Sequence, residues 1–353
     1  MKTSSGLPDA PRFEFIDALR GFAIVLVVLG HALQYTLAAP DDDPLYRLIY
    51  SFHMPLFMFI SGFVFSGAKR SASAELRLKS RSLLVPFLAW LPVTFVWMQL
   101  GPAPLSLQAF VVQVIASPDA GGLWFLWVLF LINLVMIAAR ALIRTRPQLG
   151  AWCLWAILNL IVLARPHSDL LGIKLLCWHL PFFLVGLAFR ETNGTRPLRP
   201  TIILICIAAY SLLFLSWTRV SGGSSAPLSG GLHGVLAVLE LRLFNYATAF
   251  LAIFAVFGIF SKAATTLLAK MSLPGIGRIS LEIYVTHIYF IAMAVSAIAA
   301  LAWPTALRVS LVFAVGLTGA LAATWAIRRL PPLAAVMFGV RSRERAGPVQ
   351  AKA

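Results

Sequence analysis

The chain has 353 residues, of which 60% are hydrophobic and 12% are charged, and its mean hydropathy is +0.86. A soluble domain carries about twice that charged fraction, so the composition excludes one and indicates an integral protein of the lipid bilayer. The formal net charge of +16 would suit a nucleic-acid partner. The Lys and Arg residues, however, fall between apolar segments in alternate loops, as orientation signals do, so we expect no nucleic acid to bind.

Ten apolar segments are long enough to cross a hydrocarbon core of about 30 Å as helices. Their approximate bounds are 18–39, 46–67, 82–100, 122–143, 149–165, 171–190, 200–217, 235–260, 277–301 and 306–328. A further stretch, 103–117, is amphipathic and short, which is typical of an interfacial or re-entrant helix. The sequence therefore predicts an all-α fold, a polytopic membrane bundle of about ten transmembrane helices.

The loop charges predict that both termini are cytoplasmic. In that orientation 23 of the 29 Lys and Arg residues lie on the inner side, and the first outer loop carries Asp41, Asp42 and Asp43. No linker separates a second folded unit, so we expect one transmembrane domain, residues 1–340. A disordered, basic cytoplasmic tail would follow at 341–353. These features predict a multi-pass integral membrane protein.

The first apolar segment contains a stripe of ionisable residues. Arg20 and His31 are eleven residues apart, which on a helix returns to within about 20° of the same face, roughly 16 Å further along. Asp17 lies on the same stripe, one turn before Arg20. Such residues are costly in a bilayer and mark functional sites. An interfacial ion pair would account for Asp17 and Arg20 but leaves His31 unexplained.

Three further histidines fall inside predicted spans: His53, His179 and His287. The short connection between the first two spans allows His53 and His31 to meet at similar depth. Each histidine could instead join two helices by a hydrogen bond without doing chemistry. Histidine is nevertheless the remaining candidate for a catalytic base, because the chain has no phosphate-binding glycine loop, no nucleophile elbow and no metal-binding Cys/His spacing.

A basic cluster precedes the third span. It consists of Lys69, Arg70, Arg77, Lys79 and Arg81. The cluster could be a topology signal alone, or it could bind a polyanionic cytosolic ligand through its phosphates.

Four sequence segments, in this order, resemble the acyltransferase 3 family of membrane proteins. They are the R-x10-H pattern from Arg20 to His31, the segment from Phe52 to Phe63, the segment from Gly122 to Leu126, and the segment from Ser280 to His287. The resemblance covers nearly the whole chain. It departs from the family at Ser82, where relatives often carry a basic residue before the proline of the third span, so the register of the basic cluster is shifted.

The resemblance implies O-acyl transfer, usually of acetyl from acetyl-CoA, to a hydroxyl of a cell-envelope or exported carbohydrate or glycolipid. His31 would be the general base or an acyl relay, His53 a second catalytic candidate, and Asp17 would orient Arg20. The acyl-CoA phosphates would be held by Arg20 with some of Arg77, Lys79 and Arg81, and no metal is expected. Substrate-binding or supporting candidates are Ser61, Trp124, His179, Glu282 and His287.

Two non-enzymatic hypotheses remain open at this point. A glycan or lipid transporter would also have about ten helices with polar residues at mid-depth, but it would need no acyl donor. A purely structural membrane protein would tolerate the loss of both Arg20 and His31.

Overall fold

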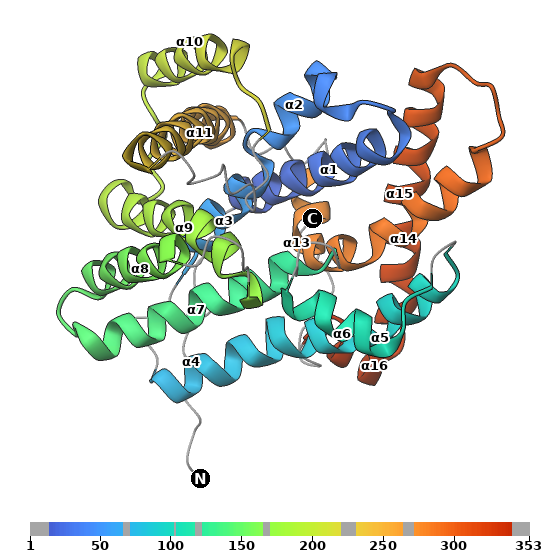
Figure 1. The fold of residues 1–353 in the computed structure, drawn as a ribbon, viewed down its shortest axis with the longest axis horizontal. Coiled ribbons are helices and arrows are strands. Elements are labelled where there is room, and N and C mark those ends of the chain that lie inside the picture. The colour runs from blue at the N-terminus through green and yellow to red at the C-terminus, as the bar shows by residue number, and fades with distance from the viewer. Residues whose placement is uncertain are drawn as a thin grey trace, which may run out of the picture.

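The computed structural model describes residues 14–65, 71–101, 104–116, 122–164, 170–219, 231–263 and 272–340, and within these ranges it contains helices and no strand. Figure 1 shows the helices gathered around α1. The α-helices are α1 (Glu14–Thr36), α2 (Pro44–Tyr50), α3 (His53–Phe63), α4 (Ala72–Lys79), α5 (Val85–Gln99), α6 (Leu107–Ala116), α7 (Trp124–Leu142), α8 (Pro147–Ala164), α9 (Ile173–Asn193), α10 (Pro200–Leu215), α11 (Gly231–Lys262), α13 (Leu273–Arg278), α14 (Ser280–Ile298), α15 (Thr305–Arg328) and α16 (Pro331–Met337).

The predicted all-α class is confirmed. By length and composition, seven helical stretches in the described part of the chain are able to cross a membrane: Glu14–Thr36, Ala72–Gln99, Trp124–Leu142, Ile173–Asn193, Leu236–Lys262, Ser280–Ile298 and Thr305–Arg328. Three shorter apolar helices are Leu107–Ala116, Pro147–Leu163 and Pro200–Leu215. The total of ten spans and the cytoplasmic termini stay predictions, and the predicted tail at 341–353 lies outside the described residues.

The second predicted span is broken into α2 and α3. Asp43 caps α2, because its side chain accepts a hydrogen bond from the Tyr46 amide at 2.8 Å. The break falls at Phe52, whose backbone angles (φ −149°, ψ −14°) are not helical, and α3 begins at His53. Non-helical backbone at membrane depth is tolerated where protein surrounds it. The break therefore places His53 at a helix start inside the bundle.

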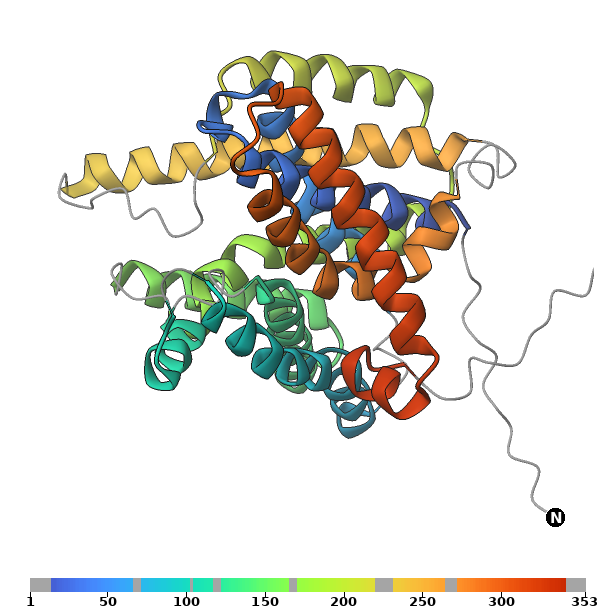
Figure 2. The ribbon, with the colours of Figure 1, turned by 90° about the vertical axis from the view of Figure 1, so that its right-hand side faces the viewer.

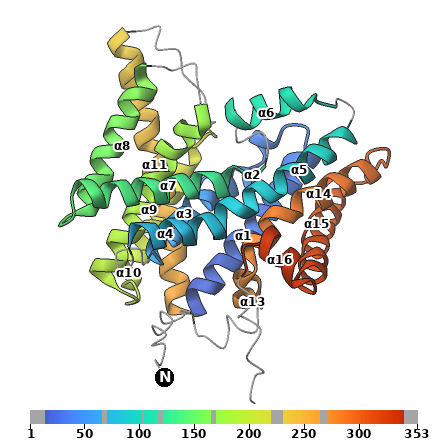
Figure 3. The ribbon, with the colours of Figure 1, turned by 90° about the horizontal axis from the view of Figure 1, so that it is seen from below.

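The third predicted span begins earlier than expected, with α4, and contains one wide turn. A π-helical segment, Ser80–Leu84, joins α4 to α5, and Pro86 is the second residue after it. A proline lacks the backbone N–H and its ring clashes with the carbonyl four residues earlier, so the helix widens at this position. Arg81 lies on this wide turn. Within the predicted amphipathic stretch, Leu107–Ala116 form α6, which lies beside the end of α5 in Figure 3.

Close packing around small residues fixes the central helices. A Cβ atom on Gly21 would collide with the Leu273 carbonyl, so α1 and α13 touch backbone to backbone. A Cβ atom on Gly62 would likewise collide with the Phe183 carbonyl, which joins α3 to α9. Such contacts at small residues are the usual way in which membrane helices pack. Figure 2 shows α15 crossing the bundle, with α16 at its end.

Candidate active site

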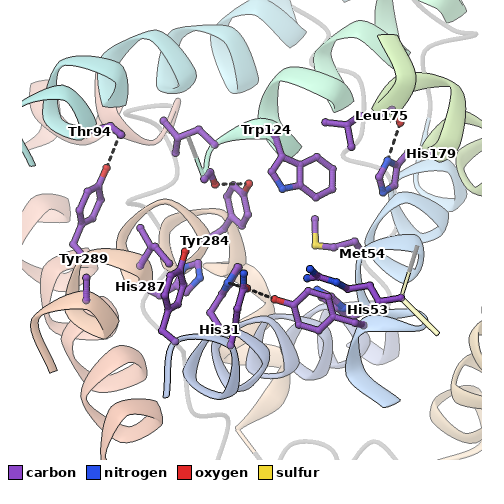
Figure 4. Close-up of a pocket in the computed structure, with 18 of the residues that line it drawn as sticks. His31, His53, Met54, Thr94, Trp124, Leu175, His179, Tyr284, His287 and Tyr289 are labelled. Atoms are coloured by element: carbon purple, nitrogen blue, oxygen red, sulfur yellow. Dashed lines mark hydrogen bonds between the residues drawn. The ribbon is translucent and has the colours of Figure 1, made fainter. Parts of the chain in front are cut away.

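The four histidines that the sequence places inside spans all line one cavity of about 720 Å³. They are His31 on α1, His53 at the start of α3, His179 on α9 and His287 on α14. Connections that follow α5 and α10 and precede α7 also line the cavity, whereas Arg20 does not. The helices thus bring together side chains that are far apart in the sequence, as Figure 4 shows.

Gln34 fixes the orientation of His31. The Nδ1 atom of His31 lies 3.1 Å from Oε1 of Gln34, and the Tyr50 hydroxyl donates to the same oxygen at 2.5 Å. Because an amide oxygen only accepts, His31 carries its hydrogen on Nδ1 in this arrangement. The Nε2 lone pair of the half-buried His31 is then available to take a proton or attack a carbonyl.

The other three cavity histidines share this protonation pattern. The Nδ1 atoms of His53, His179 and His287 lie 2.7, 2.8 and 3.0 Å from the carbonyl oxygen four residues earlier, and a carbonyl oxygen only accepts. All three side chains are buried. Each therefore offers an Nε2 lone pair, the form that a base or a hydrogen-bond acceptor requires.

His287 is the imidazole that packs closest to His31 among the ring contacts in the described chain. Their ring centroids are 5.3 Å apart, and no described group hydrogen-bonds to the buried Nε2 atom of His287. One turn earlier, the Tyr284 hydroxyl donates to the Gly122 carbonyl at 2.8 Å and accepts from the Phe125 amide at 3.1 Å. These two bonds tie α14 to the start of α7 and hold His287 at the cavity.

Two of the other predicted residues lie away from the cavity. Ser61 donates to the Phe57 carbonyl within α3 at 2.8 Å and does not line the cavity. Glu282 is buried and forms an ion pair with Arg328 of α15. Trp124, in contrast, does line the cavity, and its ring lies 4.9 Å from that of His179.

Arg20 and Asp17 form the ion pair that the sequence suggests. Nη1 of Arg20 lies 3.6 Å from Oδ1 of Asp17 at the first turn of α1. Both side chains are partly buried, with exposed fractions of 32% for Arg20 and 13% for Asp17. The pair stands at the opposite end of α1 from His31, roughly 16 Å away at 1.5 Å per residue.

The basic cluster lies on a different set of helices. Arg77 and Arg81 are exposed, on α4 and on the wide turn after it. Lys79 lies 3.8 Å from the buried carboxylate of Glu75 and over the Phe65 ring. α4 packs on α7, whereas α1 packs mainly on α13, α14 and α15. Lys69 and Arg70 lie outside the described residues.

Several cavity residues escaped the sequence analysis. Gln34 lies three residues after His31 on the same helix face, a spacing that could have identified it. Tyr284 has the same spacing before His287 and is visible on that face in the sequence. Arg219 had no such signal. Its Nε lies 3.1 Å from Oδ1 of Asp41, its Nη1 donates to the Tyr46 hydroxyl at 2.6 Å, and its guanidinium lies over the Tyr50 ring. This cluster joins α2 to the segment after α10 at the cavity wall.

No group of three or more His, Cys, Asp or Glu side chains suited to a metal ion is found in the part of the chain that the structure describes. The side chains that line the cavity instead offer imidazole lone pairs, hydroxyl groups and aromatic faces. Such a set can remove a proton from a hydroxyl group and hold a polar organic substrate.

A helical membrane bundle with an internal cavity lined by four histidines defines the class: a multi-pass integral membrane protein. The family model described as an acyltransferase domain matches residues 13–329, and the chain belongs to this acyltransferase 3 family. It is therefore a membrane acyltransferase, and the family indicates a carbohydrate acceptor. This membership favours the enzyme over the transporter hypothesis.

Two curated relatives carry the name nodulation protein NolL. The chain is 30% identical to the protein of Mesorhizobium japonicum over 217 residues, which cover 58% of this chain and 56% of the relative. It is 28% identical to the protein of Sinorhizobium fredii over 288 residues, which cover 77% of this chain and 76% of the relative. No solved structure was found to match the chain.

Proposed function

We propose that this protein transfers an acyl group, in the usual case acetyl, from cytoplasmic acyl-CoA to a hydroxyl of a cell-envelope or exported carbohydrate. The observation that carries the proposal is the position of His31. Its Nδ1 is engaged by Gln34 and its Nε2 lone pair is available beside a cavity large enough for an organic substrate. A bacterial inner membrane is the proposed location, and both curated relatives come from bacteria.

The reaction has two routes, and His31 serves either. In direct transfer, Nε2 of His31 removes the proton of the acceptor hydroxyl while its oxygen attacks the thioester carbonyl. A C–O bond forms, the C–S bond breaks, and the CoA thiolate leaves and takes the proton from the imidazolium. In a relay, Nε2 itself attacks the thioester, the C–S bond breaks and the CoA thiolate leaves. The acceptor hydroxyl then attacks the acyl-imidazole, the C–N bond breaks, and the hydroxyl proton ends on the CoA thiol. His53, which lines the same cavity, is the second catalytic candidate.

The donor phosphates would bind near the start of α1. Arg20 would contact them, Asp17 would hold Arg20 in place, and some of Arg77, Lys79 and Arg81 would complete the site. Guanidinium groups suit phosphate oxygens because they donate two parallel, charge-assisted hydrogen bonds. Support comes from the 3.6 Å contact between Arg20 and Asp17 and from the exposure of Arg77 and Arg81.

Mass spectrometry of surface glycans from cells with and without the gene tests this proposal. We expect the glycans of the deletion strain to lose the mass of one acyl group per modified sugar, and complementation to restore it. In a second assay, purified protein in lipid nanodiscs receives labelled acetyl-CoA and the glycan from deletion cells. Identical glycan masses in both strains, together with no label transfer, would contradict the proposal.

A further inference from the structure

Among the residues that line the cavity, two groups of ring-bearing side chains stand on different sides. His31 and His287 lie together on one side, and Trp124 and His179 lie on another side in Figure 4. Trp178 lines the cavity beside His179 in the sequence of α9. The first group contains the proposed base, whereas the second has no part in the proposed proton transfer.

The indole N–H groups of the second group donate to no residue in the part of the chain that the structure describes. Trp90, Trp127 and Trp155 each donate the indole hydrogen to a backbone carbonyl at 2.7 to 2.9 Å. For Trp124 and Trp178, no such hydrogen bond exists to any described residue, although both side chains are partly buried. A partly buried indole N–H normally finds an acceptor, so these two are suited to donate to a bound molecule.

The ring faces of these tryptophans are held in place by the protein. The Trp124 ring lies 4.9 Å from His179, and the Trp178 ring stacks on Tyr246 with centroids 4.4 Å apart. Tyr246 in turn donates to the Trp178 carbonyl at 3.1 Å. Flat faces that are fixed in this way bind apolar C–H surfaces with little loss of side-chain entropy.

His179 adds an acceptor. Its Nδ1 hydrogen is engaged by the Leu175 carbonyl, which leaves the Nε2 lone pair for a hydroxyl donor. This aromatic wall, formed by Trp124, Trp178 and His179, thus combines rigid aromatic faces, two N–H donors and one acceptor. A pyranose ring has matching features, because its axial C–H groups form an apolar face and its hydroxyls both donate and accept.

We propose that Trp124, Trp178 and His179 form the subsite that binds a pyranose ring of the acceptor, an assignment that rests on the proposed function. The ring stacks on the indole faces, its oxygens accept from the indole N–H groups, and one hydroxyl donates to Nε2 of His179. A second hydroxyl of the same glycan then reaches His31.

The aromatic wall lies away from the start of α1, where the donor phosphates are proposed to bind. Trp124 starts α7 next to the connection that contains Gly122, and the connections after α5 and α10 line the same cavity. In the predicted orientation all three connections face outward, where an exported glycan would arrive. Arg20, at the start of α1, lies on the other side of His31. A donor nucleotide bound at Arg20 would not occupy the aromatic wall, which would stay accessible to the acceptor.

Saturation-transfer NMR on the purified full-length protein in nanodiscs tests the subsite with methyl glycosides of hexoses, deoxyhexoses and N-acetylhexosamines. Acetyl-CoA binding is measured in parallel by calorimetry. We expect at least one glycoside to bind the wild type, and Trp124→Ala, Trp178→Ala and His179→Gln to weaken that binding roughly tenfold or more, as truncating a buried aromatic anchor does. Acetyl-CoA binding stays unchanged. Trp124→Phe, which keeps a ring but loses the N–H, gives an intermediate loss without disturbing the fold.

Two controls give each result a meaning. Trp303→Ala removes an exposed tryptophan between α14 and α15 and leaves glycoside binding unchanged. His31→Ala lowers the rate of acyl transfer by about 10²- to 10⁴-fold but keeps glycoside binding, so failure of the proposed function and failure of the subsite are distinct. The subsite is overturned if no glycoside binds the wild type, or if the variants bind glycosides normally. It is equally overturned if the variants lose acetyl-CoA instead, which would assign the wall to the pantetheine arm.

Discussion

The imidazole rings of His31 and His287 lie with their centroids 5.3 Å apart and their planes inclined by 39°. One comes from the first helix and the other from α14, and each has its Nδ1 engaged by the protein. Both Nε2 atoms are thus available to one reacting group. This relationship makes the two histidines a candidate functional unit, with Gln34 and the Ile283 carbonyl as the groups that orient them.

Replacing these histidines singly and together tests whether they act as a unit. We expect His31→Ala to lower the rate of acyl transfer by about 10²- to 10⁴-fold, the contribution typical of a general base. We expect His287→Ala to cause a smaller loss, and the double variant to be no worse than His31→Ala, because groups that act together give non-additive effects. The measurement is the initial rate of label transfer from acetyl-CoA in nanodiscs.

The matched control for this series is His167→Ala. His167 falls between the predicted spans 149–165 and 171–190 and outside the described residues, and this change should leave the rate unaltered. A double variant whose loss equals the product of the two single losses would show that the histidines act independently. A His31→Ala protein with the wild-type rate would exclude His31 as base and as relay.

Gln34 is expected to act through His31. Gln34→Leu removes the oxygen that accepts from both His31 and Tyr50, so the imidazole loses its fixed tautomer and orientation. We expect kcat to fall roughly tenfold, equivalent to about 1.4 kcal/mol, with little change in the KM for acyl-CoA. Tyr50→Phe, which leaves the bond between Gln34 and His31 intact, should have a smaller effect. A change confined to the donor KM would assign Gln34 to donor binding instead.

The sequence predicts much of the chemistry but not its arrangement. Membrane-length apolar segments and in-span histidines are visible as patterns of composition and spacing, and so is the pairing of Asp17 with Arg20, one helical turn apart. The contact between His31 and His287 is not visible, because hydropathy does not encode the order of helices around a bundle. It depends instead on close contacts such as that of Gly21 with Leu273.

The break between α2 and α3 also escaped prediction. Pro55 gave a local signal: it lacks the N–H that would bond to the Ser51 carbonyl, and proline favours the first turn of a new helix, such as the one that begins at His53. The break is also held by tertiary contacts: Ser51 lies 2.9 Å from the Tyr210 hydroxyl, and Arg47 donates to the Trp217 carbonyl. These partners come from α10 and the segment after it, and only the folded bundle brings them to α2.

Arg20 is predicted to contribute to donor affinity rather than to the chemical step. Arg20→Ala should raise the KM for acyl-CoA about tenfold or more, because a charge-assisted hydrogen bond contributes roughly 1.5 to 3 kcal/mol. Asp17→Asn should have a smaller effect, since it only loosens Arg20. Steady-state kinetics with acetyl-CoA separates KM from kcat, and Arg146→Ala, in an exposed inner loop of the predicted topology, is the control.

The same assay identifies which members of the basic cluster share the donor. Arg77 and Arg81 are exposed, so their replacement by Ala should raise the donor KM without loss of folded protein. Lys79→Ala should instead lower thermal stability, because Lys79 accompanies the buried carboxylate of Glu75. If Arg20→Ala lowers kcat and leaves the donor KM unchanged, Arg20 does not bind the phosphates.

The contact between α1 and α13 gives a prediction about stability with an internal control. A Cβ atom on Gly277 would collide with the Asp17 carbonyl, whereas one on Gly275 would meet nothing closer than 3.9 Å. Gly277→Ala must therefore push α13 away from α1, at a cost of about 1 to 3 kcal/mol, as overpacking usually requires. The melting temperature of the detergent-solubilised protein should fall, and the donor KM should rise because Asp17 and Arg20 lie at this contact.

Gly275→Ala lies on the same short helix and changes the same residue type, so it should keep the wild-type melting temperature and donor KM. The comparison separates the close contact from a general effect of alanine in α13. If the two variants melt alike, the backbone contact does not hold the start of α1. If Gly277→Ala melts early but binds acetyl-CoA with unchanged affinity, the packing of α13 stabilises the fold without positioning Arg20.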